Sequence, residues 1–196
     1  MENRPTRVRL LDAAHDLMLT LGLARTTTKE IARAAGCSEA ALYKHFDSKE
    51  DLFVRVLSER LPPLAPLLSS LAAEPGRRSL EENLTEIAHQ ACLFYEQSFP
   101  IAASLYAEPQ LKRRHDEAMR EHGTGPHIPI EGLDAYLRAE QALGRVRPGA
   151  DTFAGASLLL GACAQRAFAY EAAQERPDAA GFAARLARTL VAGLAA

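Results

Sequence analysis

The chain has 196 residues, enough for one large domain or two smaller ones with a substantial buried core. Hydrophobic residues make up 47% of the sequence and charged residues 24%, an ordinary globular composition that excludes an intrinsically disordered chain. The formal net charge is −2, so any nucleic-acid partner has to be held by a local basic patch and not by a global positive field.

The apolar residues are mainly Ala and Leu, whereas Val and Ile supply only five residues each. Because sheets favour β-branched and aromatic residues, this composition predicts an all-α fold. The three cysteines, Cys37, Cys92 and Cys163, are widely spaced, which predicts reduced thiols in a cytoplasmic protein and no pair that could close into a disulfide. No secretory signal or membrane-spanning segment is expected, since no apolar run approaches roughly 20 residues.

Four helices in quick succession are predicted for the first part of the chain. The first covers about residues 5–21 and ends at Gly22, because apolar residues recur there at steps of three and four. Thr27 or Thr28 caps a short second helix that ends at Gly36, and Ser38 caps a third that reaches about His45. Asp47 or Ser48 caps the fourth, whose first turn is rich in acidic residues.

Prolines at 62, 63 and 66 predict that the fourth helix stops or kinks near Leu61, either as a pivot or as a static kink. We therefore expect two domains, residues 1–57 and 58–196. Ser79 begins a helix to about Ser98, and Pro100 and Pro109 each begin a shorter one. A loop over 123–129 precedes a helix that ends at Gly144, and two long helices over about 151–174 and 178–194 follow. The overall expectation is an all-α fold of about nine helices.

The last two predicted helices are unusually rich in alanine, with 17 alanines among residues 150–196. Alanine lets helix axes approach closely, and the apolar positions extend too far round these helices to face a single core. We interpret residues 151–196 as a subunit interface of a homodimer. The alternative is a pair of central core helices in a monomer.

Residues 26–46 fit a helix-turn-helix with Gly36 in the turn. Apolar residues on one side would pack both short helices against the first helix. Small residues at Ala40 and Ala41 would let the third helix lie deep in a DNA major groove. The outer face, which includes Lys29, Tyr43 and His45, is therefore the candidate functional surface.

Over about residues 8–57 the sequence resembles the TetR (tetracycline-repressor-like) family of one-component bacterial transcriptional regulators. The resemblance rests on a run of short motifs in register: Thr27-Thr28, Ile31-Ala32, Ala35-Gly36, Ala41-Leu42-Tyr43, His45-Phe46, Ser48-Lys49-Glu50 and Leu52. Beyond residue 57 it extends only to the order of helices. It implies a protein that is not an enzyme, binds a palindromic operator in double-stranded DNA as a homodimer, and is released or shifted by a small-molecule effector.

The resemblance also implies residue roles. Thr28 and Lys29 would touch the DNA backbone or a base edge, Glu39, Ala40 and Ala41 would face bases, and Tyr43, His45 and Lys49 would hold phosphates. Hydroxyl, imidazole and ammonium groups complement phosphate oxygens, whereas the Glu39 carboxylate repels phosphate but accepts a hydrogen bond from cytosine N4. Arg4, Arg7 and Arg9 either add phosphate contacts or form a solvated basic end.

An effector site is predicted in the second domain, where His89, Cys92 and Glu96 share one helix face. The full candidate set is His89, Cys92, Glu96, Tyr95, Phe99, Tyr106, Gln165 and Phe168, with Arg166 beside the last two. The alternative is that these are ordinary core or solvated residues.

No metal site is expected, because His89 and Cys92 have no tight ligand pair with His115, His122 or His127. No cofactor is expected either, since no phosphate-binding loop, GxSxG, HExxH or dinucleotide motif occurs. Two other functions remain open: a helix-turn-helix regulator controlled by a protein partner, and an enzyme on a helical scaffold. The sequence leaves open the operator, the regulated genes, the effector, the sign of the response and the number of dimers per operator.

Overall fold

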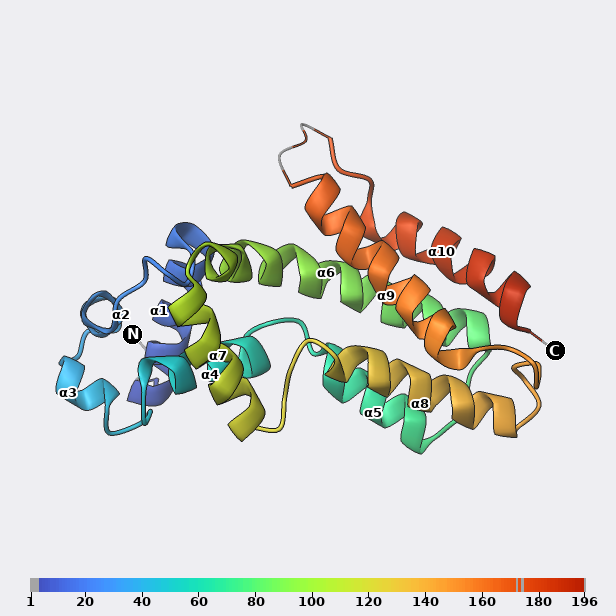
Figure 1. Ribbon diagram of the computed structural model, residues 1–196, viewed down its shortest axis with the longest axis horizontal. Coiled ribbons are helices and arrows are strands. Elements are labelled where there is room, and N and C mark those ends of the chain that lie inside the picture. The colour runs from blue at the N-terminus through green and yellow to red at the C-terminus, as the bar shows by residue number, and fades with distance from the viewer. Residues whose placement is uncertain (1–3, 172, 174, 196) are drawn as a thin grey trace. The chain divides into compact units, whose positions relative to one another are not determined.

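The computed structural model describes residues 4–171, 173 and 175–195 (Figure 1). The described residues form ten α-helices, and their only β contact is a single bridge between Val146 and Ala195. The predicted all-α class is confirmed, with ten helices in place of about nine.

The chain divides into two compact units, the first made of residues 1–61 and 97–125 and the second of residues 62–96 and 126–196. The long helix α6 (Leu80–Ala107) contributes residues to both units. The first compact unit includes residues 97–125 in addition to the start of the chain. The division into a DNA-binding domain, residues 1–57, and a second domain, residues 58–196, therefore stays a prediction.

The first unit contains α1 (Thr6–Leu21), α2 (Thr28–Ala34), α3 (Glu39–Leu42), α4 (Lys49–Glu59) and α7 (Pro109–Glu121). Each short helix begins at a polar cap: the Thr27, Ser38 and Ser48 side chains accept hydrogen bonds from backbone N–H groups of α2, α3 and α4. At α2 the cap is reciprocal, because the Glu30 carboxylate also accepts from the Thr27 N–H at 3.2 Å. These caps let helices of only four to eleven residues begin at fixed positions.

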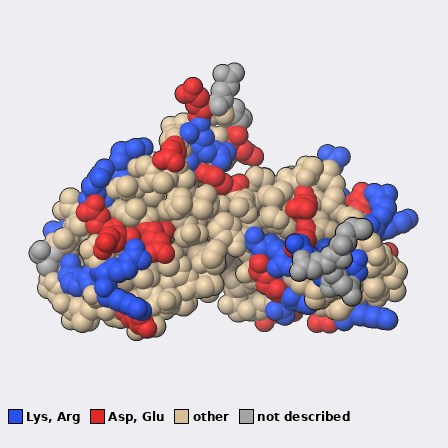
Figure 2. Space-filling view, turned by 180° about the vertical axis from the view of Figure 1, so that it is seen from behind, with Lys and Arg blue, Asp and Glu red and all other residues tan. Residues whose placement is uncertain are grey.

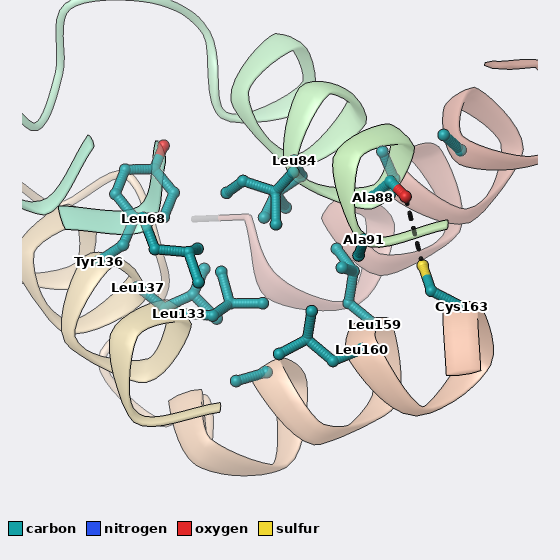
Figure 3. Close-up of a cluster of buried hydrophobic side chains, with 14 of the residues drawn as sticks. Leu68, Leu84, Ala88, Ala91, Leu133, Tyr136, Leu137, Leu159, Leu160 and Cys163 are labelled. Atoms are coloured by element: carbon teal, nitrogen blue, oxygen red, sulfur yellow. Dashed lines mark hydrogen bonds between the residues drawn. The ribbon is translucent and has the colours of Figure 1, made fainter. Parts of the chain in front are cut away.

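The second unit packs α5 (Leu64–Ala73), α8 (Ile128–Ala142), α9 (Thr152–Ala169), α10 (Ala179–Leu194) and the first part of α6 around one apolar core. Figure 3 shows that leucines from four of these helices meet in the core, among them Leu68, Leu84, Leu133 and Leu159. A buried polar pair crosses the same core, since the Asn83 amide donates to the Tyr136 hydroxyl at 2.8 Å. The apolar faces read from the sequence therefore converge on one core in this unit.

The structure corrects four helix boundaries. Pro100 does not begin a new helix but lies inside α6, where it removes one backbone hydrogen bond while the buried side chains of Ile101 and Leu105 hold the following turns in place. The proline-rich segment after Leu61 forms helix α5, because Pro66 lies in its first turn, where no N–H is needed. Helix α3 ends at Leu42 and not near His45, and α8 begins at Ile128, within the predicted loop. The predicted end of the ninth helix, Gln174, lies outside the described residues.

Candidate DNA-binding surface

The turn between α2 and α3 is built around Gly36, whose φ of 67° lies in the left-handed region that favours glycine. The Gly36 N–H donates to the Arg33 carbonyl at 3.1 Å, and the Cys37 N–H donates to the Ala32 carbonyl at 2.9 Å. These bonds end α2 and turn the chain into Ser38, the cap of α3. Both short helices bury their apolar faces, which comprise Ile31, Ala32, Ala35, Leu42 and, just beyond α3, Phe46.

Two arginines of α1 contact the helices of this motif and the helix that follows it. The Arg9 guanidinium donates to the Ala35 carbonyl at 2.8 Å, at the C-terminal end of α2. Arg7 makes a two-bond ion pair with Glu59, at 2.8 and 2.5 Å, and its guanidinium lies 5.6 Å from the centre of the Phe46 ring. Both arginines therefore hold the helices together, whereas the sequence suggested phosphate contacts or a solvated end. Arg4 is exposed, and its Nη1 atom lies 3.4 Å from Asp12 Oδ2.

The predicted DNA-contacting residues lie on the outer side of α2, α3 and the start of α4. Lys29, Glu39, Ala40, Tyr43 and His45 are exposed, and Thr28, Ala41 and Lys49 are half-buried. Tyr43 stands out because an aromatic side chain is 49% exposed there without covering the core. The combination of a small-residue centre with hydroxyl, imidazole and ammonium groups around it fits a groove flanked by phosphates.

Three consecutive threonines before and within α2 make three different contacts. The Thr26 hydroxyl is fully buried and donates to the Gly22 carbonyl at 2.9 Å, and Thr27 is the reciprocal cap of α2. The Thr28 hydroxyl donates to the Glu39 carboxylate at 2.5 Å, which joins the first residue of α2 to the first residue of α3. This last bond connects two predicted DNA-contacting residues, and sequence spacing alone did not reveal it.

Lys49, the first residue of α4, packs along the protein surface before reaching solvent. Its ammonium nitrogen lies 5.1 Å from the centre of the Phe53 ring, a cation–π distance. Burial lowers the pKa of Lys49 from its ordinary value of 10.5. The aromatic contact limits the positions of this ammonium group, as a fixed phosphate contact requires.

Helix α7 packs against α4 in the first unit, through residues that the sequence reading did not connect. His122 Nε2 lies 2.7 Å from Asp51 Oδ1, and the Arg114 guanidinium donates to Glu50 at 3.0 Å. Burial alone would raise the pKa of Asp51, but hydrogen bonds from His122, the Asp47 N–H and Arg55 outweigh it and hold the pKa below its ordinary value. The Asp51 carboxylate therefore ties the start of α4 to the end of α7.

Replacing Asp51 by Asn is expected to destabilise the protein above pH 5, with the difference from wild type shrinking as the pH falls. The folded-state pKa of Asp51 is lowered, so its contribution is present above the unfolded-state pKa of about 4 and is lost as the pH falls through the folded-state pKa. Urea unfolding measured from pH 7 to pH 2.5 checks this. A stability difference that does not change with pH would show that the Asp51 charge has no part in holding the α4 and α7 contact.

On the face drawn in Figure 2, Lys and Arg side chains lie among Asp and Glu side chains. The described residues include several ion pairs, such as Arg78 with Glu86 and Lys112 with Asp116 at 2.6 Å. Any DNA contact must therefore depend on the specific geometry of α2, α3 and α4 rather than on net charge.

In the second unit, Glu96 belongs to a buried ion-pair cluster. The Arg166 side chain is 2% exposed, pairs with Glu96, donates to the Pro177 carbonyl, and lies 5.6 Å from the centre of the Phe182 ring. Arg176 pairs with the other Glu96 oxygen at 3.3 Å. Of the predicted effector residues, Glu96 is thus held by internal partners, and His89 is half-buried near the start of the same helix.

Cys92 and Cys163 meet in the core, although no cysteine pair was expected from their spacing. The Cys163 thiol contacts the Ala88 carbonyl at 3.5 Å, one helical turn before Cys92 (Figure 3). A hydrogen bond between the two thiols raises the pKa of Cys163 and lowers that of Cys92, and Arg166 also favours the Cys92 thiolate. Burial raises the pKa of nearby Tyr95 to about 12. The expectation of isolated thiols is therefore wrong for these two residues.

The remaining predicted effector residues are divided between the two compact units. Phe99 and Tyr106 belong to the first compact unit, and Tyr106 is 77% exposed. Gln165 is exposed on α9, and Phe168 on the same helix is 71% exposed. The candidate set in the second unit is thus reduced to His89, Cys92, Tyr95 and Glu96, with Arg166 beside them.

In residues 4–171, 173 and 175–195, no group of three or more His, Cys, Asp and Glu side chains is arranged to hold a metal ion. None of the helices in this same part of the chain has the length and apolarity that crossing a membrane demands.

Comparison with known proteins connects this surface to a function. Residues 10–56 match the family model described as bacterial regulatory proteins, tetR family. The HTH-type transcriptional repressor KstR2 of Rhodococcus jostii is 35% identical over 98 residues, which cover 46% of this chain and 48% of that protein. The HTH-type regulator YvkB of Bacillus subtilis is 46% identical over 56 residues, which cover 29% of this chain and 30% of that protein. The matched part thus spans less than half of the length of each of these relatives.

A solved structure extends the likeness to the whole fold. The transcriptional regulator FadR from Bacillus subtilis, in complex with stearoyl-CoA, has a TM-score of 0.70 and 17% identity, with 95% of this chain and 98% of that chain covered. At this identity the likeness shows the fold alone.

Proposed function

We propose that this chain is a homodimeric repressor, and not an enzyme, and that it binds a palindromic operator; the match of residues 10–56 to the tetR family of bacterial regulatory proteins supports this. The observation that carries the proposal is the outer face of α2 and α3. Small side chains lie at its centre, polar donors surround it, and a buried core supports it from behind. We also propose a cytoplasmic location, which binding to bacterial DNA would require.

Tyr43, His45 and Lys49 are proposed to hold phosphates on either side of the groove, and Lys29 to contact the backbone or a base edge. A phenol, an imidazole and an ammonium group donate to phosphate oxygens and fix the position of the protein without reading sequence. The contact of Lys49 with Phe53 supports this role, because it reduces the conformational freedom that DNA binding would otherwise remove.

Glu39, Ala40 and Ala41 are proposed to face the bases. Ala40 and Ala41 present methyl groups that can touch a thymine methyl, and Glu39 presents an acceptor to cytosine N4. With few base contacts available, sequence-dependent DNA shape supplies much of the specificity.

The homodimer is proposed to form through residues 151–196, of which residues 172, 174 and 196 lie outside the described part. Apolar side chains on α9 support this: Leu158 is 66% exposed and Phe168 is 71% exposed, and Ala154 and Gly161 are exposed beside them in helical register. An exposed apolar helix face of this kind is typical of a subunit interface.

A small-molecule effector is proposed to bind within the second unit and to favour a conformation with lower DNA affinity. FadR from Bacillus subtilis, which shares the fold, was solved with stearoyl-CoA. In this chain, His89, Cys92, Tyr95 and Glu96 on α6 are the proposed contacts. The second candidate function, control by a protein partner, differs in one observable: mass spectrometry under native conditions would then detect no stoichiometric small molecule on the purified protein.

Replacing Tyr43 by Phe or Lys49 by Met is expected to weaken DNA binding about 5- to 20-fold for every sequence alike. The Lys49 change should also lower the slope of log affinity against log salt by about 1, since one phosphate contact is lost. Selection of bound duplexes from a randomised pool, followed by salt titration of the recovered site, tests this. A sequence-selective loss with an unchanged salt slope would contradict the phosphate role of Lys49.

The wild-type protein in this selection tests the proposed function itself. Recovery of a two-fold-symmetric site would support a dimeric regulator and define the spacing of its half-sites. If folded, ligand-free protein enriches no sequence, the proposed DNA-binding function is wrong.

A further inference from the structure

A side-chain hydrogen bond joins Thr28 and Glu39 on the proposed reading face, which is the outer side of α2, α3 and the start of α4. The Thr28 hydroxyl donates to Glu39 Oε1 at 2.5 Å, between helices α2 and α3 and 11 positions apart in sequence. Each residue is the first of its helix, and the caps Thr27 and Ser38 fix the backbone immediately before them. The two side chains therefore start from well-defined positions.

The hydrogen-bond chemistry of this pair is asymmetric. An ionised carboxylate only accepts hydrogen bonds, whereas a threonine hydroxyl has a single proton to donate. In the observed geometry that proton is committed to Glu39 Oε1, so the Thr28 hydroxyl has no proton left for a phosphate oxygen. Glu39 keeps its second oxygen, Oε2, for another donor.

The bond also restricts an otherwise flexible side chain. A free glutamate on a helix surface populates several rotamers, and fixing it on binding costs conformational entropy. A glutamate already held by a neighbouring hydroxyl loses less freedom when it meets a base. It also presents a fixed negative group, which repels the N7 acceptors of guanine and adenine, the O6 acceptor of guanine and the O4 acceptor of thymine. Cytosine presents an amino donor without an adjacent acceptor of its own in the major groove.

We propose that Thr28 is a positioning residue that determines specificity through Glu39, and that the pair selects a cytosine at one position in each half-site. This inference rests on the proposed DNA-binding function and refines it. It assigns Thr28 a role different from the direct DNA contact implied by the family resemblance, because the hydroxyl acts on Glu39 and not on the DNA.

The test is the same duplex selection, carried out with wild type, Glu39→Gln, Thr28→Val and Thr28→Ser. Val has the shape of Thr but no hydroxyl, and Ser keeps the hydroxyl. Glu39→Gln should change the preferred base at one position per half-site. Thr28→Val should relax the preference for cytosine at that same position about tenfold. Its affinity for sites with another base there should stay within about twofold of wild type.

Controls separate this effect from misfolding and from direct contact. Thr20→Val removes a hydroxyl on α1 that donates to the Asp16 carbonyl at 2.7 Å, away from the reading face, and should leave the preference unchanged. Thr28→Ser should restore the wild-type preference. Circular dichroism and urea unfolding establish that each variant is folded. A double-variant cycle of Thr28→Val with Glu39→Gln should show that the two effects at the cytosine position are not additive.

The outcomes distinguish the inference from the function on which it rests. No enrichment by wild type would refute both. Enrichment by wild type with an equal loss of affinity of Thr28→Val for all sequences would show that Thr28 contacts the DNA backbone, and would overturn the inference alone. A Thr28→Val variant with the wild-type base preference, or a Glu39→Gln variant with no change at any position, would overturn it as well.

Discussion

Replacing Glu96 by alanine is expected to lower the free energy of unfolding by about 3 kcal/mol. Its partner Arg166 is 2% exposed and always charged, so the variant removes the carboxylate that neutralises a buried guanidinium, while the contacts with the Pro177 carbonyl and the face of Phe182 remain. The Arg166 Nε atom already has no hydrogen-bond partner among the described residues. Urea unfolding followed by circular dichroism measures the loss.

Helix α6 itself offers the matched control. Glu86 also pairs with an arginine, but its side chain is 39% exposed and that of Arg78 is 46% exposed. Because solvent screens exposed ion pairs, Glu86→Ala should cost less than about 1 kcal/mol. Adding Arg166→Met to Glu96→Ala removes the unpaired charge and should recover part of the loss. Equal costs for Glu86→Ala and Glu96→Ala would show that burial of the Arg166 pair does not decide its energy.

Replacing Leu158 by glutamate is expected to raise the dissociation constant of the proposed homodimer at least about 100-fold, which corresponds to about 2.7 kcal/mol. Leu158 is 66% exposed on α9, and a two-fold interface would bury the new carboxylate once in each subunit without a partner. Sedimentation velocity over a range of concentrations measures the change. Operator affinity should fall in parallel, since two reading heads are then no longer joined.

Ser69→Glu adds the same charge at an exposed position of α5 and should leave the sedimentation profile unchanged. A monomeric wild-type protein would show that residues 151–196 do not form the proposed interface. A Leu158→Glu variant that stays fully dimeric would place the interface on another surface.

The elements that could be predicted from the sequence are those fixed by neighbouring residues. Thr27, Ser38 and Ser48 were expected as helix caps or as one of two candidates, and each accepts a backbone hydrogen bond in the structure. Capping and left-handed glycine turns depend on a few adjacent positions, so a local reading is sufficient. The outer face of the helix-turn-helix followed from the same local periodicity.

Prolines were the main source of error in the helix boundaries. The fourth helix ends at Glu59, close to the expected Leu61, but no helix was expected at Pro66 and a new one was expected at Pro100, because proline is unfavourable in a helix interior. In the structure α5 contains Pro66 and α6 continues through Pro100, where the buried side chains of Ile101 and Leu105 hold the following turns. Tertiary packing of this kind involves residues far apart in sequence and is not visible in local propensity.

The contacts that refine the site are also long-range. Arg7 and Glu59 are 52 positions apart, and Asp51 and His122 are 71 apart. Cys92 and Cys163 belong to different helices, and their spacing gave no indication that they would meet. The sequence pattern predicts which residue types lie on a face, but it does not predict which of these side chains bond to one another.

The three threonines at positions 26–28 show what this means for reading related sequences. A run of three identical residues suggests that the three positions have the same role. Here Thr26 is buried, and its hydroxyl donates to the Gly22 carbonyl. Thr27 caps α2, a role that Ser, Asp or Asn performs equally well. The Thr28 hydroxyl donates to Glu39. In an alignment the middle column should therefore vary freely among cap residues, while the third column should change together with the column of Glu39.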